Sequence, residues 1–225
     1  MSLTVKKDKA IIVFARLPVE GKVKTRLAKE IGNKNAASFY SVCAEHLLSE
    51  VRETKKFGVD LFLFYSNQIE ADRIKKWVGR DFSFYAQTCD DLGIRMLNAF
   101  KSVFNNGYEK IIIVGTDVPD MNFRLLEIAF DELDRNEFVV GPSEDGGYYL
   151  LGMKTLTEDI FEGINWGTET VFNSTIKKLD HKNVSYKMLK KLMDIDTKQD
   201  LLNWFHNSDN NHPIKKYVES IKEFL

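Results

Sequence analysis

The run of apolar residues at positions 111–114 constrains the fold of this chain more than any other segment. Its sequence is Ile-Ile-Ile-Val, and the residues that follow are Gly-Thr-Asp-Val-Pro, which include Asp117 and Pro119. Four β-branched residues without polar alternation predict a strand buried on both faces, as in a parallel sheet covered by helices. Because Pro119 ends the strand, we expect Asp117 at the carboxyl edge of the sheet, where open α/β sheets bind ligands. A carboxylate there either forms a turn or holds a metal ion or a ribose.

Segments typical of strands alternate along the chain with segments of helical periodicity. This alternation predicts an α/β fold of three layers, α/β/α, with a mostly parallel central sheet. A length of 225 residues fits one domain that spans positions 1–225, with a polar linker and a C-terminal helix at 207–225. Besides 111–114, the expected strands are 10–15, 60–65, 82–86, 137–141 and 184–189, and the expected helices are 35–53, 69–78, 93–104, 122–133, 169–179, 198–206 and 214–224.

The composition narrows the classes of function. The chain has 32 basic and 33 acidic residues and a formal net charge of -1, so no overall charge favours binding to nucleic acid or to a membrane surface. Cys43 and Cys89 are the two cysteines, which excludes a disulfide framework and a cysteine-rich zinc site. No apolar run approaches the roughly 18 residues that span a bilayer. We therefore expect a soluble, cytoplasmic protein that binds neither nucleic acid nor membrane.

The segment 16–26 (RLPVEGKVKTR) follows the first expected strand and is rich in basic residues. As a loop it would lie at the same sheet edge as Asp117, so that Lys22, Lys24 and Arg26 could converge on phosphate oxygens. Gly21 would let the backbone approach the ligand closely. The spacing is that of neither a P-loop nor a GxGxxG fingerprint. The alternative is a solvated basic loop without a ligand.

Arg95 is a second candidate for anion binding. It lies in the first turns of the expected helix 93–104, where a cation gains nothing from the helix dipole. Asp90 or Asp91 can cap this helix. The position of Arg95 therefore suggests that an anion holds it, and that anion is either one of these aspartates or a ligand.

Further acidic residues fall in loops that can reach the same edge. Asp145 precedes a Gly-Gly pair, which indicates either a tight turn or space for a ligand. Asp194 and Asp196 lie before the expected helix 198–206. Trp166 lies in a loop, where it could stack on an acceptor or pack against the sheet. Basic and acidic side chains at one edge of a nearly neutral protein suit a metal-bound diphosphate, with Mg²⁺ or Mn²⁺ as the metal.

Five ordered segments carry a resemblance to a known family: 18–27 (PVEGKVKTRL), 92–96 (LGIRM), 115–119 (GTDVP), 141–149 (GPSEDGGYY) and 166–168 (WGT). In these segments the chain resembles a bacterial family of proteins with the glycosyltransferase-A (GT-A) fold, labelled nucleotide-diphospho-sugar transferases or selenium-domain-associated transferases. It is also similar to the wider group of nucleotidyltransferases that make molybdenum-cofactor dinucleotides and guanylylated phospholactate. The segment 194–201 (DIDTKQDL) is similar to a closing motif of that wider group.

The resemblance implies a GT-A-type fold and a metal-dependent transferase that uses a nucleotide-diphospho-sugar and an unidentified small acceptor. Gly21, Lys22 and Arg95 would contribute to nucleotide binding. Lys22, Lys24 and Arg26 would hold the diphosphate, and the basic residues would stabilise it as the leaving group. Asp117, with Asp196, would bind Mg²⁺ or Mn²⁺. Asp145 would orient or deprotonate the acceptor.

Two alternatives stay open. One is a nucleotidyltransferase that joins a nucleoside triphosphate to a phosphorylated small molecule and releases pyrophosphate. The other is a nucleotide-binding module without catalysis. The chain has Asp117-Val118-Pro119-Asp120 where glycosyltransferases of this fold usually have Asp-x-Asp, and the first loop has only Gly21 where nucleotidyltransferases have a glycine-rich loop.

Overall fold

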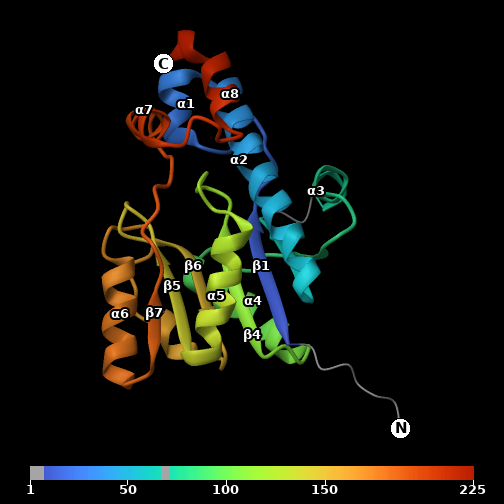
Figure 1. Ribbon diagram of the computed structural model, residues 1–225, viewed down its shortest axis with the longest axis vertical. Coiled ribbons are helices and arrows are strands. Elements are labelled where there is room, and N and C mark those ends of the chain that lie inside the picture. Colours follow the sequence, from blue (N-terminus) through green and yellow to red (C-terminus); the bar gives the residue numbers. More distant parts are fainter. Residues whose placement is uncertain (1–7, 67–70) are drawn as a thin grey trace.

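A computed structural model describes residues 8–66 and 71–225 of the chain (Figure 1). Its centre is a sheet with the strand order β3-β2-β1-β4-β6-β5-β7. Strand β6 is antiparallel to its neighbours β4 and β5, and the other pairs of neighbouring strands are parallel. The strands are β1 (Lys9–Ala15), β2 (Val59–Tyr65), β3 (Ser83–Ala86), β4 (Lys110–Gly115), β5 (Phe138–Pro142), β6 (Tyr148–Met153) and β7 (Tyr186–Met188).

Helices cover both faces of this sheet, which confirms the predicted three-layer α/β/α architecture. Helices α2, α3 and α5 pack on one face, and α4 and α6 pack on the other. The bounds are α1 (Thr25–Ile31), α2 (Asn33–Glu53), α3 (Ala71–Val78), α4 (Leu92–Asn105), α5 (Phe123–Arg135), α6 (Val171–Lys182), α7 (Lys198–Asn207) and α8 (Lys215–Ser220), with short 3-10 turns at Thr54–Phe57, Glu158–Phe161 and Lys222–Phe224.

Strand β4 is buried on both faces, as its sequence predicts. Ile111 and Ile113 pack in the core beneath α4, whereas Ile112 and Val114 pack in the core beneath α2 and α5. None of these four side chains is more than 4% exposed. The strand is therefore a fixed central support, and the residues after Gly115 leave it at the carboxyl edge of the sheet.

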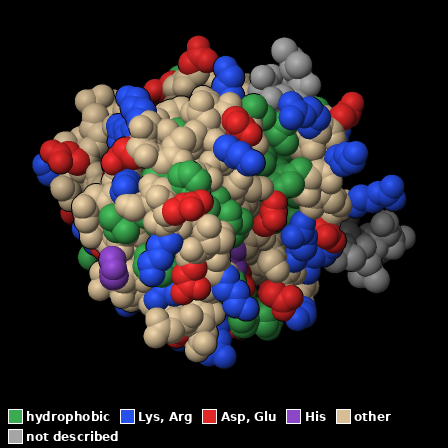
Figure 2. All heavy atoms as spheres, turned by 90° about the horizontal axis from the view of Figure 1, so that it is seen from above, with side chains coloured by type: hydrophobic (Ala, Val, Ile, Leu, Met, Phe, Trp, Pro, Cys, Tyr) green, Lys and Arg blue, Asp and Glu red, His purple; other side chains and the backbone are tan. Residues whose placement is uncertain are grey.

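A group of helices projects beyond this carboxyl edge. The first half of α2 packs with α1, α7 and α8 around an apolar cluster that includes Leu27, Phe39, Trp204 and Val218. Figure 1 shows these elements together at the top of the view, above the strands. Figure 2 views the molecule from that end, and basic and acidic side chains are interspersed on the visible face. We refer to α1, the first half of α2, α7 and α8 as the helical cap.

Several predicted boundaries need correction. The loop predicted over 16–26 ends earlier, because α1 begins at Thr25. The helix predicted over 169–179 runs from Val171 to Lys182 and is preceded by Thr170; the hydroxyl of Thr168 donates instead to the carbonyl of Asn165. The predicted strand 184–189 is reduced to β7 at the edge of the sheet. Positions 69 and 70 of the helix predicted over 69–78 lie outside the described residues.

The C-terminal part follows the prediction in outline. Helix α7 extends to Asn207, so the linker begins one residue later than expected. The helix predicted over 214–224 divides into α8 and a short 3-10 turn. In the part of the chain that the structure describes, no helix has both the length and the apolar character needed to cross a membrane.

Candidate functional site

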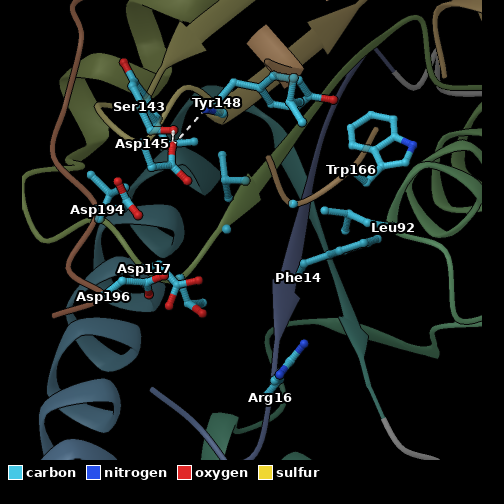
Figure 3. Close-up of a pocket in the computed structure, with 18 of the residues that line it drawn as sticks. Phe14, Arg16, Leu92, Asp117, Ser143, Asp145, Tyr148, Trp166, Asp194 and Asp196 are labelled. Atoms are coloured by element: carbon cyan, nitrogen blue, oxygen red, sulfur yellow. Dashed lines mark hydrogen bonds between the residues drawn. The ribbon is translucent and has the colours of Figure 1, made fainter. Parts of the chain in front are cut away.

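A pocket of about 570 Å³ lies between the carboxyl edge of the sheet and the helical cap (Figure 3). Its walls come from the ends of β1 and β4, the turn between β5 and β6, the start of α1, and the loops before α4, α6 and α7. In Figure 3, Asp117, Asp145, Asp194 and Asp196 gather on one side of the pocket, and Phe14, Leu92 and Trp166 lie on the other. The volume is in the range of small-molecule sites.

Lys24 connects the cap to the acidic side of the pocket. Its Nζ lies 2.8 Å from Oδ1 of Asp117 and 3.1 Å from Oδ1 of Asp196. The side chain is only 3% exposed, whereas those of Asp117 and Asp196 are 52% and 44% exposed. Burial alone would lower the pKa of Lys24, but the charges of the two carboxylates outweigh it and raise the pKa. Lys24 is therefore a permanent cation between two accessible carboxylates.

The backbone before α1 places Lys24 there. Lys24 precedes the first residue of α1 with φ 45° and ψ 48°, in the left-handed region that a residue with a side chain rarely adopts. Arg26 follows in the first turn of the helix, and its Nη1 lies 3.6 Å from Oδ2 of Asp196. The start of α1 therefore places two basic side chains, Lys24 and Arg26, next to the carboxylate of Asp196.

Asp117 is positioned by the residue before it and by the loop that follows β7. The hydroxyl of Thr116 shares a 2.9 Å hydrogen bond with the hydroxyl of Tyr40 on α2. The backbone carbonyl of Asp117 accepts a 3.3 Å hydrogen bond from the backbone N–H of Ile195. Burial, with the nearby charge of Asp117, raises the pKa of Tyr40 to about 12. Tyr40 therefore stays a neutral structural link between α2 and the end of β4.

Asp196 belongs to a turn that its neighbours hold in place. The carboxylate of Asp200 accepts hydrogen bonds from the backbone N–H of Asp196 (3.1 Å) and of Thr197 (2.7 Å). The side-chain hydroxyl of Thr197 accepts a hydrogen bond from the backbone N–H of Asp200, which completes a capping box at the start of α7. The first turn of α7 therefore presents Asp196 to the pocket.

Asp145 is held by the turn in which it lies. Its Oδ1 accepts hydrogen bonds from the hydroxyl of Ser143 (2.5 Å) and from the backbone N–H of Gly147 (2.8 Å). Asp194 lies close enough for the two charges to interact, and burial together with Asp145 raises the pKa of Asp194 to about 6. Asp194 can therefore take up a proton near pH 6, well above the range of an ordinary aspartate.

The structure brings most, but not all, of the predicted site residues together. Lys24, Arg26, Arg95, Asp117, Asp145 and Asp196 all line the pocket. Gly21 and Lys22 do not: both are exposed in the turn before α1, outside the residues that form the pocket wall. The turn that begins α1 places Lys24 and Arg26 in the pocket wall, and a part for Lys22 in phosphate binding stays a prediction.

Other residues of the pocket are not apparent from sequence patterns. Tyr40 lies in the middle of a helix, and Gln87 lies in a loop without a distinctive motif. Arg16 and Thr116 lie in segments that the sequence analysis singled out, but neither was named as a site residue. The one signal that the three loop residues share is that each directly follows a strand. Trp166 lines the pocket and also stacks on Phe161, so both predicted roles, wall and packing, are compatible with its position.

Asp120 does not join Asp117. Its Oδ1 accepts a 3.1 Å hydrogen bond from the indole N–H of Trp204 in α7 and lies 3.7 Å from Nε2 of His212. Between the two aspartates, Val118 is buried at 4% exposure. This segment therefore offers the pocket one carboxylate, not a pair.

The donor atoms around Lys24 suit a hard divalent cation. Asp117 and Asp196 each keep an oxygen that Lys24 does not contact at the distances given above, and Mg²⁺ is often bound by one or two carboxylates with substrate phosphates. Across the described ranges, no group of three or more His, Cys, Asp or Glu side chains is placed to hold a metal ion. A cation at this position would therefore have the two carboxylates of Asp117 and Asp196 as its side-chain ligands, with other ligands from water or a substrate.

Comparison with protein families gives one match. Residues 49–168 match the model of a family described as "Uncharacterized protein conserved in bacteria (DUF2064)", and this segment is more than half of the chain. It includes Arg95, Asp117, Asp145 and Trp166, but not the turn with Lys24 or the loop with Asp196. A comparison with curated proteins gives no match.

Solved structures show the same fold. A protein from Desulfovibrio desulfuricans G20, provisionally described as a nucleotide-diphospho-sugar transferase, is 29% identical over 96% of both chains, with a TM-score of 0.90. The 4-diphosphocytidyl-2C-methyl-D-erythritol synthase of Anaerococcus prevotii is 13% identical over 95% and 96%, with a TM-score of 0.58. The inositol-1-phosphate CTP transferase of T. maritima is 16% identical over 96% of both chains, with a TM-score of 0.52. The fold is therefore that of nucleotide-sugar-transferase-like proteins and CTP-using transferases.

Proposed function

We propose that this chain, which belongs to the DUF2064 family, is a metal-dependent transferase that uses a nucleotide-diphospho-sugar. The observation that carries the proposal is the contact of Lys24 with both Asp117 and Asp196 at the end of β4. Carboxylates open to the pocket suit a divalent cation, and Lys24 and Arg26 beside them suit the oxygens of a diphosphate.

Each charged residue has a distinct part in this proposal. Asp117 and Asp196 would hold Mg²⁺ or Mn²⁺, which supplies positive charge to a bound diphosphate. Lys24 and Arg26 would bind the diphosphate oxygens and stabilise the negative charge that develops as the sugar is transferred and the nucleoside diphosphate leaves. Asp145, held by Ser143 and Gly147, would accept a hydrogen bond or a proton from the acceptor hydroxyl.

One observation favours nucleotidyl transfer as a second candidate. Asp120 is bound to Trp204 on the cap, so the segment after β4 lacks the paired carboxylates that glycosyltransferases of this fold usually have. In this reaction a phosphate of the second substrate would attack the α-phosphate of a nucleoside triphosphate, and pyrophosphate would leave. The CTP transferases among the neighbouring structures support this candidate at the level of the fold.

The two reactions differ in their products. We would incubate the protein and Mg²⁺ or Mn²⁺ with sugar nucleotides and with nucleoside triphosphates, each with a panel of alcohol and phosphate acceptors. Release of nucleoside diphosphate from sugar nucleotides supports the proposal. Pyrophosphate release from a triphosphate supports the second candidate and contradicts the first.

Asp117→Asn tests the assigned metal ligand. We expect it to abolish the increase in nucleotide affinity that Mn²⁺ causes, measured by calorimetry. The matched control is Asp131→Asn on the exposed side of α5, away from the pocket, which should behave as the wild type. An unchanged effect of Mn²⁺ in Asp117→Asn would remove this residue from the proposed site.

A further inference from the structure

Two arginines line the pocket apart from its aspartates. Arg16 follows β1, and Arg95 lies in the first turns of α4. The guanidinium of Arg95 contacts Gln87, which directly follows β3, whereas Asp117 follows β4, three places away in the strand order. The turn with Asp145 and the loop with Asp194 follow β5 and β7, on the other half of the sheet.

Arg95 is held firmly, but its buried nitrogen lacks a partner. Its Nη1 donates a 3.0 Å hydrogen bond to Oε1 of Gln87, and Nε2 of Gln87 donates in turn to the carbonyl of Phe64 at 2.8 Å. Nε of Arg95 is buried and has no hydrogen-bond partner among the described residues. An unpaired buried donor is destabilising and rare in native proteins, so this one requires an explanation such as a ligand.

The charges around Arg95 also favour a bound anion. Burial and the nearby guanidinium of Arg16 lower the pKa of Arg95, and the charges of Asp91 and Asp90 only partly oppose this shift. The described residues provide neither arginine with a carboxylate in ion-pair contact. Asp91, a predicted partner of Arg95, instead caps α4 by accepting a hydrogen bond from the N–H of Ile94 at 2.9 Å. Two cations that repel each other in a pocket are stabilised when an anion lies between them.

Apolar side chains enclose this part of the pocket. Figure 3 shows Phe14, Leu92 and Trp166 on the side away from the aspartates. The indole of Trp166 lies directly against Gly93, where an added Cβ would be 2.3 Å from Nε1. Apolar walls exclude water and strengthen the hydrogen bonds of a bound anion.

From these observations we propose that Arg16 and Arg95 form a second anion subsite that binds a phosphoryl group of a substrate. This inference rests on the proposed function for the identity of the pocket as a substrate site, but it assigns a separate anion to the β3 side. The phosphoryl group belongs either to the second substrate or to the end of a nucleoside triphosphate.

The test compares Arg95→Met with Arg95→Lys and with Arg124→Met. Methionine keeps an unbranched apolar side chain and removes the guanidinium, and lysine retains the charge. Arg124 is the matched control, because it is exposed in the first turn of α5, outside the pocket. The probes are inorganic phosphate, a hexose 1-phosphate, nucleoside di- and triphosphates, and an uncharged nucleoside, each measured by calorimetry without metal.

We expect Arg95→Met to weaken phosphate-bearing probes about tenfold or more, Arg95→Lys to restore part of the affinity, and Arg124→Met to have no effect. A selective loss of hexose 1-phosphate supports the second substrate as the source, and a selective loss of the triphosphate supports the nucleotide. An equal loss of the uncharged nucleoside overturns the proposal, because it indicates contact with a base. Unchanged binding of every probe, or no binding of phosphate to the wild type, also overturns it.

The outcome is independent of the proposed transferase activity. Asp117→Asn should retain metal-free binding of inorganic phosphate, because Arg95 lies on the other side of the pocket. If Asp117→Asn loses the effect of Mn²⁺ and Arg95→Met does not weaken phosphate, the subsite fails while the metal site stands. If Asp117→Asn keeps the effect of Mn²⁺ and Arg95→Met weakens the binding of phosphate, the metal assignment fails and the anion subsite stands.

Discussion

Lys24 is the residue on which the geometry of the site depends most. It adopts a left-handed backbone conformation, which for a residue with a side chain costs about 1 kcal/mol. Two charged contacts and burial of the side chain offset this cost. The same contacts mean that an ammonium group already offsets part of the charge of the two carboxylates to which the proposal assigns a metal ion. A bound phosphate would draw Lys24 toward itself and leave the carboxylates free for the metal.

Lys24→Met should therefore separate the binding of metal from the binding of nucleotide. Without the competing ammonium group, we expect the affinity for Mn²⁺ alone to rise about tenfold, and the affinity for a nucleoside diphosphate to fall. Calorimetric titration with Mn²⁺ and with the nucleotide, each alone, measures both changes. Lys29→Met, an exposed lysine on the same helix, is the control. If the affinity of Lys24→Met for Mn²⁺ does not rise, the ammonium group of Lys24 and the metal ion do not compete for the two carboxylates.

At the scale of elements, buried strands were more predictable than the segments that complete the site. Runs of β-branched residues locate β1 and β4, and a run of leucine and aromatic residues locates β2, because a strand covered on both faces must be continuously apolar. They also place Asp117 and Arg16 at the carboxyl edge. Helix α1 was not predicted, because its seven residues make only two turns, too few for a repeated apolar pattern.

The contacts between remote segments could not be predicted from local patterns. The sequence predicts a loop with Asp196 and a loop with Lys24. It does not predict that these two residues, 172 positions apart, lie 3.1 Å from each other. Nor does it indicate that Lys22 lies outside the pocket wall, since this depends on the turn that begins α1. Tertiary hydrogen bonds likewise fix the hydroxyl of Tyr40 and the side-chain amide of Gln87 in the pocket wall, and local sequence does not reveal them.

Gly146 offers a test of how the turn after β5 supports the pocket. It has φ +86°, and an added Cβ would lie 2.1 Å from the backbone carbonyl oxygen of Glu169. Its own carbonyl accepts a 2.8 Å hydrogen bond from the N–H of Phe172 at the start of α6. We expect Gly146→Ala to lower the free energy of unfolding by about 1–3 kcal/mol more than backbone strain alone would.

Gly107→Ala isolates that strain. Gly107 has φ +88°, nearly the same value, but an added Cβ would meet nothing within 4 Å. Denaturant unfolding of both variants gives the two losses in free energy, and their difference reports the clash with Glu169. Equal losses in the two variants would show that the turn and the loop before α6 separate without cost.

At the scale of the whole molecule, the site exists only while the helical cap stays on the sheet. The residues after β4 reach the cap through Asp120, which accepts a hydrogen bond from Trp204 and lies 3.7 Å from His212. His212 packs edge-on against His46 of α2 at 5.3 Å between ring centroids. Its Nδ1 accepts a 3.3 Å hydrogen bond from the N–H of Ile214, so this nitrogen carries no proton in the structure.

The pKa values of the two histidines determine the sign of a pH effect. Burial lowers the pKa of both His46 and His212 below 6.5. The unfolded chain, with ordinary histidine pKa values, therefore binds more protons than the folded chain between 6.5 and the lowered values. Stability from this contact is present above pH 6.5 and is lost as the pH falls through that interval. The charged groups around the two rings are Glu50, Asp120, Asp209 and Lys215.

We therefore expect the melting temperature to fall between about pH 7.5 and pH 5, and His212→Gln to reduce that fall. Glutamine keeps a polar side chain that does not titrate, whereas in the wild type protonation of Nδ1 removes the acceptor for Ile214 and places a second positive charge near His46. The control is His181→Gln, because His181 is exposed at the end of α6, away from the cap. Thermal unfolding at each pH measures the effect as a difference between variants, so the titration of carboxylates common to all of them cancels. If His212→Gln and His181→Gln respond equally to pH, the contact between the cap and the residues after β4 does not depend on this histidine.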